Sequence, residues 1–273
     1  MSTGVSTLHL TLDHEIFAGR SGRGVRVAVV DSGIAAGHPH VGAVAASVRI
    51  GAAVNDSAAD GDASLAGPAG LRVHATDVLD RLGHGTAVAA AIREKAPGVE
   101  LLSVKVFDRA LTTTADALAL GITWAADQNV RLINLSLGTQ NPDREEVLRS
   151  AVRYAAQRGA LVVSALESAG VRWLPGSLAG VAGVLEDWEC ERGALAVEVG
   201  ASGPERFRAS AYPRPIPGVP RERNISGISF AVANVTGFLA RLCEADPAMR
   251  TLADLGRLLK PGTSGGREKS VAS

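Results

Sequence analysis

The sequence has few aromatic residues and no excess of charge of either sign. Phe, Trp and Tyr make up 4% of the 273 residues, and lysine plus arginine equal aspartate plus glutamate at 28 each. A chain without a net field attracts neither nucleic acid nor an anionic membrane surface by overall charge. We therefore expect no nucleic-acid partner and no membrane partner.

Cysteine is also scarce, and the sequence shows no secretory signal, membrane-spanning run or metal-binding motif. The two cysteines, Cys190 and Cys243, have no metal-ligand spacing, so two reduced thiols are expected. Residues 1–20 lack the basic segment and continuous apolar run of a secretory signal, and no apolar run reaches the roughly 20 residues that span a bilayer. The histidines form no metal motif and the acidic residues no calcium loop, so we predict no metal and no cofactor. Together these features predict a cytoplasmic protein.

Short apolar runs alternate with longer amphipathic segments along the chain. The runs are typical of buried strands and occupy 25–30, 101–106, 132–135 and 160–163. The amphipathic segments have apolar residues at three- and four-residue steps and occupy 86–95, 113–128 and 144–158. This alternation predicts an α/β fold, with a doubly wound, mostly parallel sheet flanked by helices on both faces. In such sheets the active site lies at the carboxyl ends of the strands.

The chain is expected to form one domain with short extensions. We predict an N-terminal extension over 1–24, the domain over 25–261 and a flexible polar tail over 262–273. Residues 55–70 are rich in Ala, Gly, Asp and Ser and are predicted to be a loop. The four prolines in 212–220 exclude regular helix or central strand there, which predicts a surface connection.

Three residues at predicted element ends could carry chemistry. Asp31 ends an apolar run and is followed by Ser-Gly, His84 lies between two glycines at a helix start, and Ser229 begins an apolar helix. Each also has a structural explanation on its own: a turn cap for Asp31, a structural histidine at a helix start, and an N-cap for Ser229.

Taken together, the three motifs resemble those of the subtilisin-like serine peptidase (subtilase) family. The matching segments are VAVVDSGI around Asp31, GHGTAVAAAI around His84 and SGISFAVANVTG around Ser229, in the order Asp, His, Ser that subtilisins use. The similarity extends over about 25–242, because VELLSVKVF and ITWAADQNVRLINLSLG resemble core elements of the family. It implies the subtilisin-like fold and a serine endopeptidase with a peptide or protein substrate.

The resemblance also implies a role for each residue. A serine hydroxyl is a weak nucleophile, so His84 would accept its proton as the hydroxyl of Ser229 attacks a peptide carbonyl. Asp31 would fix the imidazole tautomer and stabilise the imidazolium. The N–H groups at the start of the helix that carries Ser229 would stabilise the oxyanion.

The resemblance to the family also implies a substrate-binding segment. Ser136, Leu137 and Gly138 match the segment of the family that pairs with an extended peptide through main-chain hydrogen bonds. The alternative, equally open from the sequence, is a strand end with its turn glycine.

The sequence departs from the family at the oxyanion hole. Subtilases usually carry Ala-Gly-Asn after the strand that corresponds to 160–163, whereas this chain places Glu167 and Ser168 at the last two positions. Either Ser168 and the N–H of Ser229 form a weaker hole, or the hole is lost, or Asn141 or another amide fills the gap. Losing one such donor costs about 3 kcal/mol of transition-state stabilisation in a subtilisin. Glu167 could pair with a cationic substrate side chain or remain a solvated loop carboxylate.

These features predict an intracellular peptidase of restricted specificity that acts in peptide maturation. Residues 1–24 are too few for the inhibitory prodomain of secreted relatives, and a broadly degradative enzyme would endanger the cytoplasm. Two alternatives remain open: a catalytically impaired subtilase that acts as a peptide-binding or regulatory module, and a transpeptidase or ligase that uses the same acyl-enzyme. The sequence predicts no oligomeric state.

Overall fold

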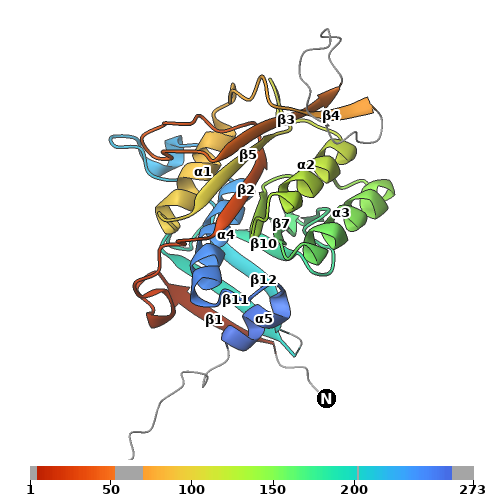
Figure 1. Cartoon of the computed structure of the whole chain (residues 1–273). Helices are drawn as coiled ribbons and strands as arrows, with labels where there is room; N and C mark the ends of the chain where they lie inside the picture. Colours follow the sequence, from red (N-terminus) through yellow and green to blue (C-terminus); the bar gives the residue numbers. More distant parts are fainter. Residues whose placement is uncertain (1–4, 53–69, 202, 260–273) are drawn as a thin grey trace, which may run out of the picture.

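A twisted central sheet organises the protein (Figure 1). The computed structural model describes residues 5–52, 70–201 and 203–259. Within them the main sheet has ten strands in the order β1-β11-β12-β10-β7-β6-β2-β5-β3-β4. The strands are β1 (Ser6–Thr11), β2 (Arg26–Asp31), β3 (Ala46–Ala52), β4 (Leu71–His74), β5 (Glu100–Lys105), β6 (Leu132–Leu135), β7 (Leu161–Ala165), β10 (Ala182–Asp187), β11 (Ala194–Gly200) and β12 (Gly203–Ser210).

The centre of the sheet is parallel and its margins are antiparallel. Strands β3, β5, β2, β6, β7, β10 and β12 pair in parallel, while β1 with β11, β11 with β12, and β3 with β4 pair antiparallel. Parallel strands need both faces covered. The predicted doubly wound, mostly parallel α/β fold is therefore confirmed.

Helices cover both faces, and the alternation of side chains in β2 shows how. Val27 and Val29 belong to the core beneath α1 (His84–Lys95), α4 (Ile228–Ala245) and α5 (Leu252–Leu258). Ala28 and Val30 point to the opposite core, beneath α2 (Ala115–Asp127) and α3 (Glu145–Gln157). Because successive side chains of a strand face opposite sides, one apolar run supplies both cores.

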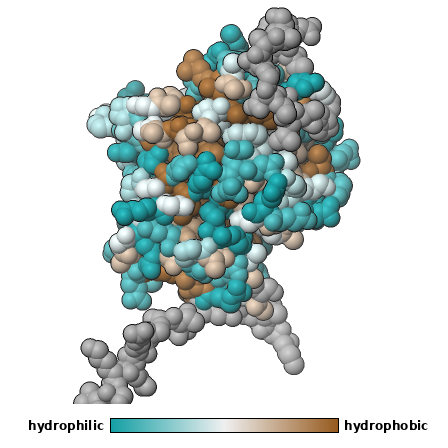
Figure 2. Space-filling model, viewed as in Figure 1, coloured by the Kyte–Doolittle hydropathy of each residue, from teal (hydrophilic) through white to brown (hydrophobic). Residues whose placement is uncertain are grey.

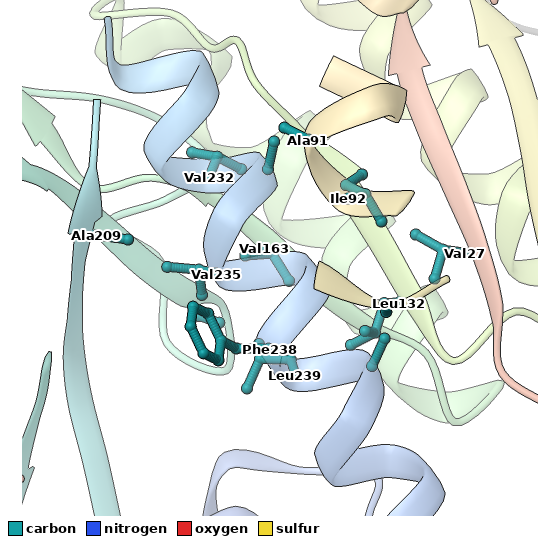
Figure 3. Packing of buried hydrophobic residues seen from close by; sticks show 14 of the residues in the cluster. Val27, Ala91, Ile92, Leu132, Val163, Ala209, Val232, Val235, Phe238 and Leu239 are labelled. Atoms are coloured by element: carbon teal, nitrogen blue, oxygen red, sulfur yellow. The ribbon is translucent and has the colours of Figure 1, made fainter. Parts of the chain in front are cut away.

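Helix α4 forms the centre of the first core. Val232, Val235 and Phe238 point from it into the cluster that also holds Ile92 of α1 and Val163 of β7 (Figure 3). The helix is long and apolar enough to cross a membrane by composition alone, but 72% of it is buried inside the fold. That burial identifies it as the core helix of a globular domain. The face shown in Figure 2 mixes hydrophilic residues with smaller apolar groups.

The ends of the predicted elements lie within two residues of the observed ends. The runs at 25–30, 101–106, 132–135 and 160–163 are β2, β5, β6 and β7, and the three amphipathic segments are α1, α2 and α3. The connection at 212–220 has no helix or strand. The predicted tail at 262–273 and nearly all of the predicted loop at 55–70 lie outside the described residues.

Part of the predicted N-terminal extension over 1–24 belongs to the sheet and core of the domain. β1 pairs with β11 along its whole length, from Ser6 opposite Val199 to Thr11 opposite Ala194. Phe17, in a 3-10 turn over Glu15–Phe17, is buried and its ring lies 5.4 Å from that of Phe238. The boundary at residue 25 therefore cuts through one continuous core.

Candidate active site

Asp31 lies at the carboxyl end of the central strand β2, where a parallel sheet places functional residues. Asp31 is fully buried. Carboxylate oxygen Oδ1 accepts a hydrogen bond from the N–H of Ser32 at 2.7 Å and lies 2.7 Å from Nδ1 of His84. Since an ionised carboxylate only accepts hydrogen bonds, the Nδ1 of His84 carries the proton in this pair.

The close approach of His84 to Asp31 depends on a glycine. His84 is the first residue of α1, and Gly85 follows it. A Cβ atom on Gly85 would lie 2.1 Å from the carbonyl oxygen of Gly33 and 3.1 Å from Cβ of Asp31. Only a residue without a side chain lets the start of α1 pack this tightly against the end of β2.

The environment of His84 raises the pKa of its imidazole. Burial disfavours the charged ring and lowers the pKa, but the hydrogen bond and charge of Asp31 and the charge of Asp80 outweigh that effect. The side chain is 14% exposed, so the ring remains partly open to solvent. A base with a raised pKa accepts a proton more readily than an ordinary histidine.

Ser229 is the second residue of α4, so it is not the N-cap, which is Gly227. The second N–H of a helix has no acceptor within the helix and is free to bind an anion. α4 packs against α1, and the ring of the next residue, Phe230, lies 5.8 Å from the ring of His84. The fold thus brings the start of α4 to the start of α1, although their motifs lie far apart in the chain.

In the observed conformer the hydroxyl of Ser229 is bonded to the backbone. It donates to the carbonyl oxygen of Ser136 at 3.3 Å, and the hydroxyl of Ser136 donates to the carbonyl oxygen of Ser229 at 3.4 Å. Among the described residues no hydrogen bond joins Ser229 to His84. Proton transfer between them therefore requires the Ser229 side chain to rotate away from Ser136.

Ser136, the first residue of the predicted substrate-binding segment Ser136–Gly138, lies beside Ser229. Asn134 supports it from below: its amide donates to Ser136 Oγ at 2.9 Å and accepts from Thr236 Oγ1 at 2.9 Å. Gly138 packs so closely on the segment around Leu174 that a Cβ there would lie 2.1 Å from the carbonyl oxygen of Leu174. Asn134 is fully buried, so its two hydrogen bonds give it a structural role beneath Ser136.

Ser168 and Glu167 lie in a separate hairpin. They form β8 (Glu167–Ser168), which pairs with β9 (Val171–Arg172) directly after β7. The Ser168 hydroxyl donates to Oε1 of Glu186 at 2.8 Å, so in this conformer it is committed to a carboxylate. Glu167 is half-buried and makes no ion pair among the described residues.

Asn141, the other residue considered for the oxyanion gap, has a structural role. Its side chain accepts from the N–H of Asp143 and caps the short 3-10 helix Pro142–Arg144. It also lines a hollow of about 390 Å³ beside Gly138, together with Phe107, Leu111, Thr112, Thr113, Thr114, Ala115, Asp116, Leu118, Leu137, Thr139 and Arg144.

The sequence interpretation missed one polar residue at this site. Asp80 accepts hydrogen bonds at the start of α1, four residues before His84. The available signal was an acidic residue just before a predicted helix start, where carboxylates commonly bind the free N–H groups.

Comparison with known proteins shows the family of the chain. A sequence profile described as "Subtilase family" matches residues 22–167. Subtilisin Savinase of Lederbergia lenta is 29% identical over 275 aligned positions, covering 96% of this chain and 91% of the relative. A "Thermostable alkaline protease" of Halalkalibacterium halodurans is 30% identical over 260 positions, covering 90% of this chain but 63% of the relative.

Solved structures show the same fold. "S41 Psychrophilic Protease" superposes with a TM-score of 0.60 at 22% identity, covering 88% of this chain and 83% of that one. "Sphericase" gives a TM-score of 0.58 at 22% identity over the same shares. By its sequence match and its fold, the chain belongs to the subtilase family of serine-type peptidases.

Proposed function

We propose that this chain hydrolyses peptide bonds with Ser229 as nucleophile, His84 as general base and acid, and Asp31 as the residue that orients His84. The observation that carries the proposal is the 2.7 Å contact between Nδ1 of His84 and Oδ1 of Asp31, at the point where α1 meets the start of α4. The contact leaves the other ring nitrogen of His84, Nε2, to exchange protons with Ser229.

The steps follow from these positions. Ser229 Oγ leaves the Ser136 carbonyl and attacks the substrate carbonyl carbon, while its proton passes to Nε2 of His84. The oxyanion that forms is stabilised by the N–H of Ser229 and the positive end of the α4 dipole. His84 then gives the proton to the leaving amine, which breaks the C–N bond and leaves an acyl ester on Ser229. Water, deprotonated by His84, resolves that ester.

Substrate is proposed to bind as an extended segment along Ser136, Leu137 and Gly138. The hollow beside Gly138 supports this, because its lining combines apolar residues such as Phe107 and Leu111 with polar ones such as Asn141, and this mixture suits a substrate side chain. Glu167 is proposed to contact a cationic substrate group, since its carboxylate is half-buried and has no ion-pair partner in the described part of the chain.

A processing role of restricted specificity, in the cytoplasm, is the biological setting we propose. Two observations support this setting. Cys190 and Cys243 are both free thiols, as suits a reducing compartment. The Ser168 hydroxyl donates to Glu186, so in this conformer it does not donate to an oxyanion and catalysis should be slow. A slow enzyme suits a dedicated substrate better than general protein degradation.

The same Ser168–Glu186 contact favours a second candidate, a peptide-binding subtilase with impaired catalysis. A fluorophosphonate probe distinguishes the two, because it labels a serine only when a base activates it. We expect labelling at Ser229, located by peptide mass spectrometry, and equal labelling of a Ser226→Ala control. Absence of labelling in the folded protein would reject the peptidase, and also a ligase, in favour of peptide binding.

Replacing Ser168 by asparagine tests the oxyanion hole itself. β7 neighbours β6 in the sheet, so the segments that follow them, with Ser168 and Ser136, leave the same edge. An asparagine amide reaches further than a serine hydroxyl, and one well-placed donor changes kcat by about 10²-fold. We expect Ser168→Asn to raise kcat by up to about that factor in a peptide hydrolysis assay. As a control, Glu186→Gln should raise it less, and an unchanged kcat in a folded Ser168→Asn protein would exclude Ser168 from the hole.

A further inference from the structure

Asp80 connects three segments at the start of α1. Its Oδ1 accepts from the hydroxyl of Ser32 at 2.8 Å and from the N–H groups of Leu82 at 3.1 Å and Gly83 at 2.8 Å. Its Oδ2 accepts from the N–H of Thr86 at 2.9 Å and the Thr86 hydroxyl at 2.6 Å. Five donors converge on one carboxylate, whereas a simple capping box satisfies two donors in all.

Through Ser32, Asp80 is linked to the Asp31–His84 pair. The Ser32 hydroxyl that donates to Asp80 accepts from the N–H of Gly85 at 2.9 Å. The N–H of Ser32 donates to the same Asp31 oxygen, Oδ1, that contacts His84. Ser32 is fully buried, so water does not compete for these bonds.

We propose that Asp80 is a positioning residue that fixes the Asp31–His84 contact and places a second negative charge beside the imidazole. It does so by tying the turn after β2 to the first turn of α1 through one carboxylate. This inference rests on the proposed function for its effect on catalysis, but its effect on His84 can be measured in the protein whether or not it is a peptidase.

The charges around the site support this role. Burial raises the pKa of Asp80, but its hydrogen bonds with Thr86, Ser32 and Gly83 outweigh burial and lower the pKa overall, so the group is ionised at neutral pH. Asp31 from β2 and Asp80 from the preceding loop are the two charged groups that raise the pKa of His84. α4 presents the uncharged ring of Phe230.

Other charged residues of the loop are paired away from His84. Arg81 binds Asp77 and Asp108, both at 2.6 Å. Lys105 donates to the carbonyl oxygen of Leu79 at 2.9 Å and to Asp108 at 3.0 Å. These contacts fasten the loop from its other side and leave Asp80 as the loop carboxylate that acts on the imidazole.

The test is Asp80→Asn, which keeps the size of the side chain and removes its charge. NMR titration of the His84 ring should give a pKa below that of the wild type, because a negative charge beside the imidazolium is lost. In peptide hydrolysis we expect kcat to fall roughly 10- to 100-fold with KM nearly unchanged, since the catalytic geometry loosens while the substrate segment is untouched. The acid limb of the pH–kcat profile should move down in pH by the same shift.

Asp254→Asn is the matched control. Asp254 accepts from the N–H groups of Arg250 and Thr251 and from the Thr251 hydroxyl at the start of α5, so it makes a comparable cap far from the triad. The control should lose similar thermal stability and keep both kcat and the His84 pKa.

The outcomes separate this inference from the proposed function. If the pKa of His84 is the same in folded Asp80→Asn and in the wild type, the inference about Asp80 is overturned, even if the protein is an active peptidase. If the wild type fails to react with the fluorophosphonate, the NMR titration still decides whether Asp80 acts on His84. Should Asp80→Asn fail to fold, Ser32→Ala breaks the link while keeping the charge. Its kcat should then fall with the His84 pKa retained, and a wild-type kcat would overturn the inference.

Discussion

A Ser229→Ala protein is expected to fold as the wild type does and to hydrolyse peptides about 10⁶-fold more slowly, a magnitude known for loss of the serine in a subtilisin. The change removes the hydroxyl oxygen that is proposed to form the acyl bond. The side chain itself makes one long contact, to the Ser136 carbonyl at 3.3 Å. Its loss should therefore change the melting temperature little.

The measurement is kcat/KM on a peptide substrate together with thermal unfolding. His84→Ala added to Ser229→Ala should cause little further loss, because the two residues act as one unit. Ser226→Ala, at an exposed serine three residues earlier in the chain, should retain full activity. Substantial hydrolysis by folded Ser229→Ala would mean that another group is the nucleophile.

Gly85→Ala is expected to damage both stability and activity. The new Cβ would lie 2.1 Å from the Gly33 carbonyl oxygen, which is backbone and cannot rotate away. α1 must therefore move from the end of β2, which we expect to cost about 1–3 kcal/mol of unfolding free energy. Because a displacement near 1 Å of a catalytic group can cost about 10²-fold in rate, kcat should fall by at least that factor.

Gly193→Ala provides the control for this substitution. A Cβ on Gly193 meets no atom within 4 Å, so the same chemical change is made in open space. It should leave kcat and the unfolding free energy close to wild type. If Gly85→Ala matched the Gly193→Ala protein in both measurements, the tight packing of α1 against β2 would not hold the Asp31–His84 contact in place.

The central strands could be predicted because their signals are local. The run before Asp31 has the length and apolar character of a strand buried on both faces, and both cores receive side chains from it. The glycines on either side of His84 are also a local signal, because glycine permits a close backbone approach and Gly85 packs against the carbonyl oxygen of Gly33.

The margins of the sheet could not be predicted in the same way. β1 pairs with β11, nearly two hundred residues later, and β12 joins this pair of strands to the parallel sheet through β10. Such pairing is set by tertiary contacts between distant segments, and the half-exposed pattern of β1 gives little periodic signal. The partner of Ser168 was missed for the same reason, because Glu186 lies on another strand.

Ser229, the proposed nucleophile, lies on α4, a helix that is largely enclosed by the fold. Thirteen residues of α4, from Phe230 to Cys243, are buried on all sides. Segments of that kind open only when the whole domain unfolds, so their backbone amides should be among the slowest in the protein to exchange with deuterium. Heat or denaturant should therefore disrupt the site only in the cooperative unfolding of the domain, and Ser229 should keep its position until then.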